Sequence, residues 1–200
     1  LINGSVASAA VVDAGGEQLT AMAFEAEQYR QLKALGRPVD GPARITALGV
    51  SVQIHADADA FASSPDSLLD PSADPAGEPP PRYLERAWAW PPRVASESFM
   101  SYGVFGDPEQ SSAHARLSGV VLSAQERVCA LTGQGFSVAT VRTVGFEAAV
   151  CLARTEHAVA PHAGNVVSGT VFLTATVESD ALVGQRRRRS VNPFGRYRAD

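Results

Sequence analysis

The chain has 200 residues, of which 45% are apolar and 19% charged, and its formal net charge is −4. This composition is typical of a folded soluble protein, and the length allows one large or two small domains. No apolar run approaches the roughly 18 residues that a membrane helix needs, which excludes an integral membrane protein and gives no reason to expect a membrane partner.

The first elements along the chain are two strands and a helix. The segment "SVASAAVVDAGGEQLTAMAFEA" predicts two strands around the turn "DAGG", where Gly15 and Gly16 suit a tight reversal. In "EAEQYRQLKALGRP" the spacing of Tyr29, Leu32 and Leu35 predicts one face of a short helix that ends near Gly36.

The segment "GVSVQIHADADA" alternates apolar and polar residues and predicts a strand. We expect His55, Asp57 and Asp59 to project from one face of this strand, opposite Val52 and Ile54. A strand of an antiparallel sheet with one solvated face explains the pattern without a ligand, so we expect no metal and no cofactor. The alternative is a metal-dependent hydrolase centred on the three polar residues. Further ligands for it would come from His114, His157 and His162.

Residues 65–82 contain six prolines and predict a linker or a long ordered loop. They divide the chain into a β-rich N-terminal region over residues 1–64, with one short helix, and a region over residues 83–180. A basic tail follows over residues 181–200.

Strand patterns recur in the second half, around "ARLSGVVLSA", "GFSVATVRTV", "FEAAVCLA" and "NVVSGTVFLTATVE". Their spacing favours an antiparallel arrangement over βαβ units. Gly119 and Gly169 lie inside two of these segments, where they would permit the sharp bends of a small barrel. The expected fold is therefore mainly β, with a small antiparallel barrel (OB-like) or a sandwich in the C-terminal half.

Familiar enzyme motifs are incomplete. "SFMSYGVFG" has Phe99 where the nucleophile elbow around Ser101 needs glycine, and "GQGFSV" has Val138 in place of the third glycine of a dinucleotide loop. A phosphate-binding P-loop needs a lysine that only Lys33 could provide, and its surroundings are not glycine-rich. We therefore expect a non-enzymatic protein rather than an enzyme.

Aromatic residues cluster after the proline-rich segment. Trp88, Trp90, Tyr102 and Phe105 are the candidate binding residues of this stretch. One interpretation is that the tryptophans pack the linker onto the barrel or join the two halves. The other is a recognition surface for a protein or, by stacking, for bases or sugars.

The tail contains Arg186, Arg187, Arg188 and Arg189. It holds six of the 17 basic residues and one of the 21 acidic ones, so its formal charge is 6 − 1 = +5, and that of residues 1–180 is 11 − 20 = −9. The tail could be disordered, dock on an acidic surface of this protein or a partner, or bind nucleic acid, which the acidic body disfavours.

Two cysteines without close spacing favour reduced thiols and a cytoplasmic protein, and the opening residues do not form a secretory signal. One lysine among 17 basic residues suggests a GC-rich bacterial genome. The expected function is an interaction or assembly module that binds another protein or itself. The alternatives are a single-stranded nucleic-acid binder and the metal-dependent hydrolase.

Overall fold

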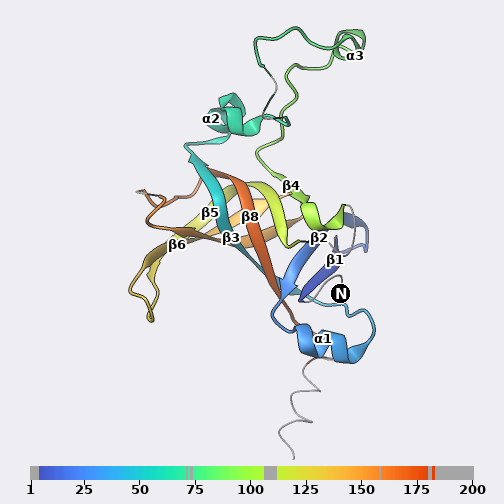
Figure 1. Cartoon of the computed structure of the whole chain (residues 1–200), viewed down its shortest axis with the longest axis vertical. Coiled ribbons are helices and arrows are strands. Elements are labelled where there is room, and N and C mark those ends of the chain that lie inside the picture. Colours follow the sequence, from blue (N-terminus) through green and yellow to red (C-terminus); the bar gives the residue numbers. More distant parts are fainter. Residues whose placement is uncertain are drawn as a thin grey trace, which may run out of the picture.

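The computed structural model describes residues 5–70, 72, 74–105, 112–157, 159–179 and 182. The protein is mainly β and contains a closed five-stranded barrel, as predicted. Its strands are β1 Val6–Val12, β2 Gln18–Ala26, β3 Ala43–His55, β4 Ser98–Ser101, β5 His114–Val128, β6 Gly135–Thr143, β7 Phe146–Ala153 and β8 Val166–Val177 (Figure 1). Its helices are α1 Tyr29–Leu35, α2 Ala58–Ser63 and α3 Pro81–Glu85, with 3₁₀ turns η1 Pro65–Ser67 and η2 Tyr102–Val104.

The barrel closes in the order β3, β7, β6, β5, β8 and back to β3. The β3–β7 pair is parallel, with Thr46 opposite Ala149, and the other pairs of the barrel are antiparallel. The β1–β2 hairpin extends the sheet from β8 through a short parallel pairing, and β4 pairs with β5. One barrel strand, β3, precedes the proline-rich segment, so the barrel draws on both sides of that segment.

The barrel interior is filled by small and branched apolar side chains. On β8, Val167, Val171, Leu173 and Ala175 are buried in this core. The other barrel strands contribute the buried residues Ala47, Val52, Leu117, Val121, Ala139, Val141, Val150 and Leu152. Burial of this continuous apolar surface is the main stabilising contribution to the fold.

Two glycines allow strands to approach more closely than any other residue would. A Cβ atom on Gly119 of β5 would lie 2.4 Å from Val141 Cγ1. Gly169 of β8 has φ +142°, and a Cβ atom there would lie 2.1 Å from the carbonyl oxygen of Ser51. The interpretation that glycines serve the strong curvature of a small barrel agrees with both positions.

The predicted alternation along β3 is interrupted at two places. A register shift between Gly49 and Ser51 leaves Val50 half exposed, while Val52 is buried. The strand ends at His55 and α2 begins at Ala58, so the prediction that Asp57 and Asp59 share a strand face with His55 is wrong. The physical reason is that Asp57 is an effective helix N-cap, because its side chain accepts a hydrogen bond from the Ala60 N–H at 2.8 Å.

The helix predicted before β3 is α1, and it ends at Gly36, which has the left-handed φ of 61°. Its Tyr29 and Leu32 pack against the core. Among the described residues, no helix has both the length and the apolar character needed to cross a membrane.

Candidate interaction site

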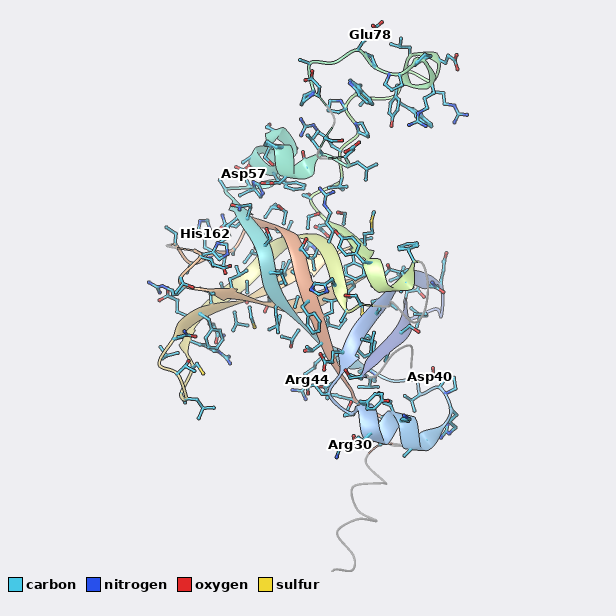
Figure 2. The ribbon with its side chains drawn as sticks, viewed as in Figure 1. Arg30, Asp40, Arg44, Asp57, Glu78 and His162 are labelled. Atoms are coloured by element: carbon cyan, nitrogen blue, oxygen red, sulfur yellow. The ribbon has the colours of Figure 1, made fainter. Side chains whose placement is uncertain are left out.

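The segment between β3 and β4, residues 56–97, forms an arm that projects from one end of the barrel. Its first part, α2 and η1, lies beside the barrel, and α3 lies at the end remote from it (Figure 1). Figure 2 shows Asp57 where the arm leaves the barrel and Glu78 at its far end. The proline-rich stretch that the sequence predicts as a linker or ordered loop, residues 65–82, lies within this projection.

The two chain segments of the arm meet at a narrow place that we call the neck, residues 64–69 and 92–94. The Leu69 N–H donates to the Pro92 carbonyl at 2.9 Å, and the Val94 N–H donates to the Ser67 carbonyl at 2.7 Å. Arg93 donates from Nη1 to the Ser64 carbonyl at 2.7 Å and also to the Ser67 hydroxyl. The neck is therefore closed by backbone pairing that a guanidinium group reinforces.

Arg116 of β5 joins the neck to the barrel. Its Nη2 donates to the carbonyl oxygens of Asp66 at 2.8 Å and Leu68 at 2.7 Å, and its Nη1 donates to that of Leu69 at 3.4 Å. Hydrogen bonds from a charged donor are stronger than those between neutral groups. Arg116 thus fixes the direction in which the arm leaves the barrel.

Three aromatic rings gather near α3. The Tyr83 ring lies edge-on to Trp88, with centroids 5.7 Å apart, and to Trp90, with centroids 5.0 Å apart. Arg86 lies over the Trp88 ring at 4.8 Å, and Arg82 lies over the Tyr83 ring at 5.3 Å. Together with Leu84, these residues form what we call the aromatic tip.

Local backbone structure brings the rings together. Pro81 occupies the first turn of α3, where the absence of an N–H costs nothing. After the helix, Ala87 adopts a φ of 51°, and the Trp88 N–H donates to the Tyr83 carbonyl at 2.9 Å. This reversal places the Trp88 ring beside the Tyr83 ring.

The tip is accessible although its rings contact one another. Trp88 is 52% exposed and Leu84 is 63% exposed. The ring contacts of both tryptophans lie within the arm, to Tyr83 and Arg86, rather than with a barrel strand. The tip therefore presents apolar surface to the solvent, bordered by two arginines.

The other candidate binding residues of the sequence lie elsewhere. Tyr102 belongs to η2, which lies against β2, and Phe105 follows it; both are exposed. Arg186, Arg187, Arg188 and Arg189 lie outside the described residues. The structure brings Trp88 and Trp90 together and separates them from Tyr102 and Phe105.

His55 is a contact between barrel and arm, which corrects the expectation of a solvated face. Its side chain is only 10% exposed, and its Nε2 lies 2.9 Å from Ser168 Oγ and 3.4 Å from Asp66 Oδ2. A catalytic triad needs the hydroxyl and the carboxylate on different ring nitrogens, whereas here both face Nε2. The edge of Phe61 also packs against the imidazole, with centroids 5.2 Å apart.

The predicted alternative of a metal site at His55 finds no support in the arrangement. Asp57 caps α2 and Asp59 lies in the first turn of that helix, where a carboxylate favours the positive end of the helix dipole. In the part of the chain that the structure describes, no three His, Cys, Asp or Glu side chains come together as a possible ion site.

Local contacts shift the pKa values of several ionisable groups. The hydrogen bond from Arg142 lowers the pKa of Glu97, at the end of the arm, and the two charges pair at 2.7 Å. Hydrogen bonds from Ser72 lower the pKa of Asp70. The pKa of Cys129 is lowered by hydrogen bonds from Thr132 and Leu131, and burial raises that of Cys151. These shifts follow from ordinary local contacts.

Tyr83, Leu84 and Arg116 are not among the candidate binding residues predicted from the sequence. Tyr83 and Leu84 belong to the same aromatic-rich stretch as Trp88, so that stretch contained a signal for them. The sequence contains no signal for Arg116, because its hydrogen-bond acceptors are backbone carbonyls, which every residue carries.

Comparison with known protein families, with curated proteins and with solved structures finds no match.

Proposed function

We propose that the protein is a non-enzymatic interaction module and that the aromatic tip is the surface with which it binds a partner protein. The observation that carries this proposal is the partly exposed aromatic cluster, with Trp88 and Leu84 as its exposed members, held away from the barrel by a braced neck. Tryptophan, tyrosine and arginine are the residues most enriched among those that dominate binding energy at protein interfaces.

The packing of the arm favours a role in binding a partner protein over a purely structural role. Edge-on packing of Tyr83 against Trp88 and Trp90 fixes the rings before a partner arrives, which reduces the entropy lost on binding. Arg82 and Arg86 supply a polar rim around Leu84 and the rings. We further place the protein in the bacterial cytoplasm, on the strength of its arginine bias and its free cysteines.

The tip can be tested by cross-linking in living cells. A photoreactive amino acid at Leu84 should give a discrete cross-linked product with a partner protein. Because Trp88 supplies part of the same surface, adding Trp88→Ala should weaken the product by about tenfold, the effect of removing one important interface residue.

The control is a photoreactive residue at Leu131, which is 96% exposed on the loop between β5 and β6. This position should not give the same product. Equal products from positions 84 and 131, or a product from position 84 that is unchanged by Trp88→Ala, would contradict the proposal.

A second candidate function is single-stranded nucleic-acid binding by an OB-like barrel, and the strand pairing favours it. In an OB barrel the first three strands pair in sequence, the third pairs in parallel with the fifth, and the fourth pairs with the fifth and the first. Strands β5, β6, β7, β8 and β3 take these five places in turn. The barrel would then be an OB fold whose last strand stands first in the chain.

The residues on the corresponding surface favour the first candidate instead. OB barrels bind oligonucleotides across their second and third strands, here β6 and β7. On the outer face of these strands Val138 lies opposite Cys151, and Thr140 lies opposite Ala149. The middle of this face therefore offers neither a ring nor a charge. At its two ends Phe136 lies opposite Ala153, and Arg142 lies opposite Glu147. Phe136 is thus the one aromatic ring on which a base could stack here, and the charge of Arg142 is already paired with Glu97 at 2.7 Å.

We therefore expect only weak binding of a labelled single-stranded oligonucleotide at about 0.15 M salt, measured by fluorescence anisotropy. The reason is that the charge of −9 over residues 1–180 repels a polyanion. Deletion of residues 185–200 removes the arginines of the basic tail and should abolish the weak binding that remains. Submicromolar binding that survives this deletion and is lost in Thr140→Glu would instead favour the second candidate.

A further inference from the structure

The outer edge of β1 is an open edge of the sheet. Among the strands that the structure describes, β2 alone pairs with β1. The Ala26 N–H donates to the Ser5 carbonyl at 3.0 Å, which identifies Ser5 and Ala26 as a hydrogen-bonded pair of the antiparallel hairpin. Odd-numbered residues of β1 bond to β2, and the even-numbered residues Val6, Ser8 and Ala10 direct their N–H and C=O groups away from it.

In the part of the chain that the structure describes, this edge has none of the usual protection against pairing. The strand reads "VASAAVV", without a charged residue or a proline, and Ser8, Ala9 and Ala10 are exposed. Natural sheets commonly protect an open edge with lysine, proline or a covering segment. An unprotected row of backbone donors and acceptors is suited to an extended strand as its occupant.

We propose that β1 pairs with β1 of a second copy of this chain, antiparallel about a two-fold axis at Ala9. This register places Val6 opposite Val12 and Ser8 opposite Ala10, so that every outward-directed residue meets another one. Ala7 and Val11 are the two residues of β1 that contact the core of their own chain. In this register Ala7 of each chain lies opposite Val11 of the other, so the core-facing side chains of the two chains lie next to one another.

The charge pattern favours a second copy as the occupant. In antiparallel self-pairing a charged residue close to the two-fold axis faces its own copy, which is destabilising, and β1 contains no charged residue. The nearest charged residue, Asp13, would lie opposite Ser5 of the partner in this register. The arm leaves the barrel at another place, so pairing through β1 keeps the aromatic tip accessible (Figure 1).

Sedimentation velocity over a range of protein concentrations tests the proposal. The unmodified chain should dimerise reversibly. Ala10→Pro removes an N–H that points away from β2, and by symmetry the dimer loses two donors, so its dissociation constant should rise at least about tenfold. Ala10→Lys should have a similar effect through charge repulsion, without any change to the backbone.

Leu131→Lys is the matched control, because it adds the same charge at an exposed site away from the edge, and it should dimerise like the unmodified chain. Hydrogen exchange gives a second readout: the amides of Ser8 and Ala10 should become protected only at high concentration, and those of Ala7 and Ala9 at every concentration. A chain that is monomeric at all concentrations, or a dimer insensitive to both Ala10 variants, would overturn the proposal.

Discussion

Gly169→Ala is expected to unfold the barrel or to lower its free energy of unfolding by about 4 kcal/mol or more, a large part of the stability of a typical domain. Gly169 has a positive φ that alanine adopts only with strain, and the added Cβ would overlap the carbonyl of Ser51 and approach Val52 Cα to 2.8 Å. Both contacts are with backbone atoms of β3, which cannot move without opening the barrel. Urea denaturation followed by circular dichroism measures the effect.

Gly15→Ala is the matched control. Gly15 lies in the exposed turn between β1 and β2 without a positive φ. A Cβ atom added there would lie 3.3 Å from Oδ1 of Asp13, a side-chain atom that accepts hydrogen bonds from the Gly15 and Glu17 N–H groups, and would meet no backbone atom of the barrel. We expect its urea midpoint to change by the equivalent of about 0.5 kcal/mol or less. Similar midpoints for the two variants would mean that the barrel does not depend on the close approach of β8 to β3.

Arg116→Ala is expected to release the neck from the barrel while the barrel stays folded. The substitution removes the hydrogen bonds to the carbonyls of Asp66, Leu68 and Leu69. Loss of a charged donor costs about 2 kcal/mol, which corresponds to roughly thirtyfold faster exchange through local opening. Hydrogen exchange of the Leu69 and Val94 amides, which close the neck, measures this change.

Arg154→Ala tests whether the effect is specific. Arg154, which directly follows β7, pairs with Glu126 of β5 at an exposed site, and surface ion pairs contribute little to stability. The neck amides should exchange at the unmodified rate in this variant. If Arg116→Ala leaves those amides unchanged as well, the backbone pairing of the neck is sufficient by itself.

The fold was largely predictable because its strands follow simple physical patterns. Alternation along β8 and the turn before β2 depend on local side-chain preferences, and both strands lie where the sequence predicts them. The membership of β3 in the barrel was not predictable in the same way. Its pairing with β7 and β8 joins residues about 100 positions apart or more, and local patterns carry no information about such contacts.

The candidate site was predictable in composition and not in geometry. The clustering of Trp88 and Trp90 in the sequence indicated a shared location, which the structure has. The pattern at His55 suggested a longer strand, because the apolar–polar alternation continued past the helix cap at Asp57. In the structure the strand ends before Asp57, which caps α2. Whether an aspartate continues a strand or caps a helix depends on the surrounding tertiary contacts, which the local sequence does not show.

The closed neck has a consequence for how the protein can change over evolutionary time. Because Leu69 and Pro92 are hydrogen-bonded to each other, the chain between them begins and ends at almost the same point. Insertions, deletions or an entirely different recognition element could replace residues 70–91 with little disturbance to the barrel, since the entropic cost of a longer closed loop grows slowly with its length. The barrel is in this sense a scaffold, and the arm is an exchangeable part whose specificity can diverge independently of the fold.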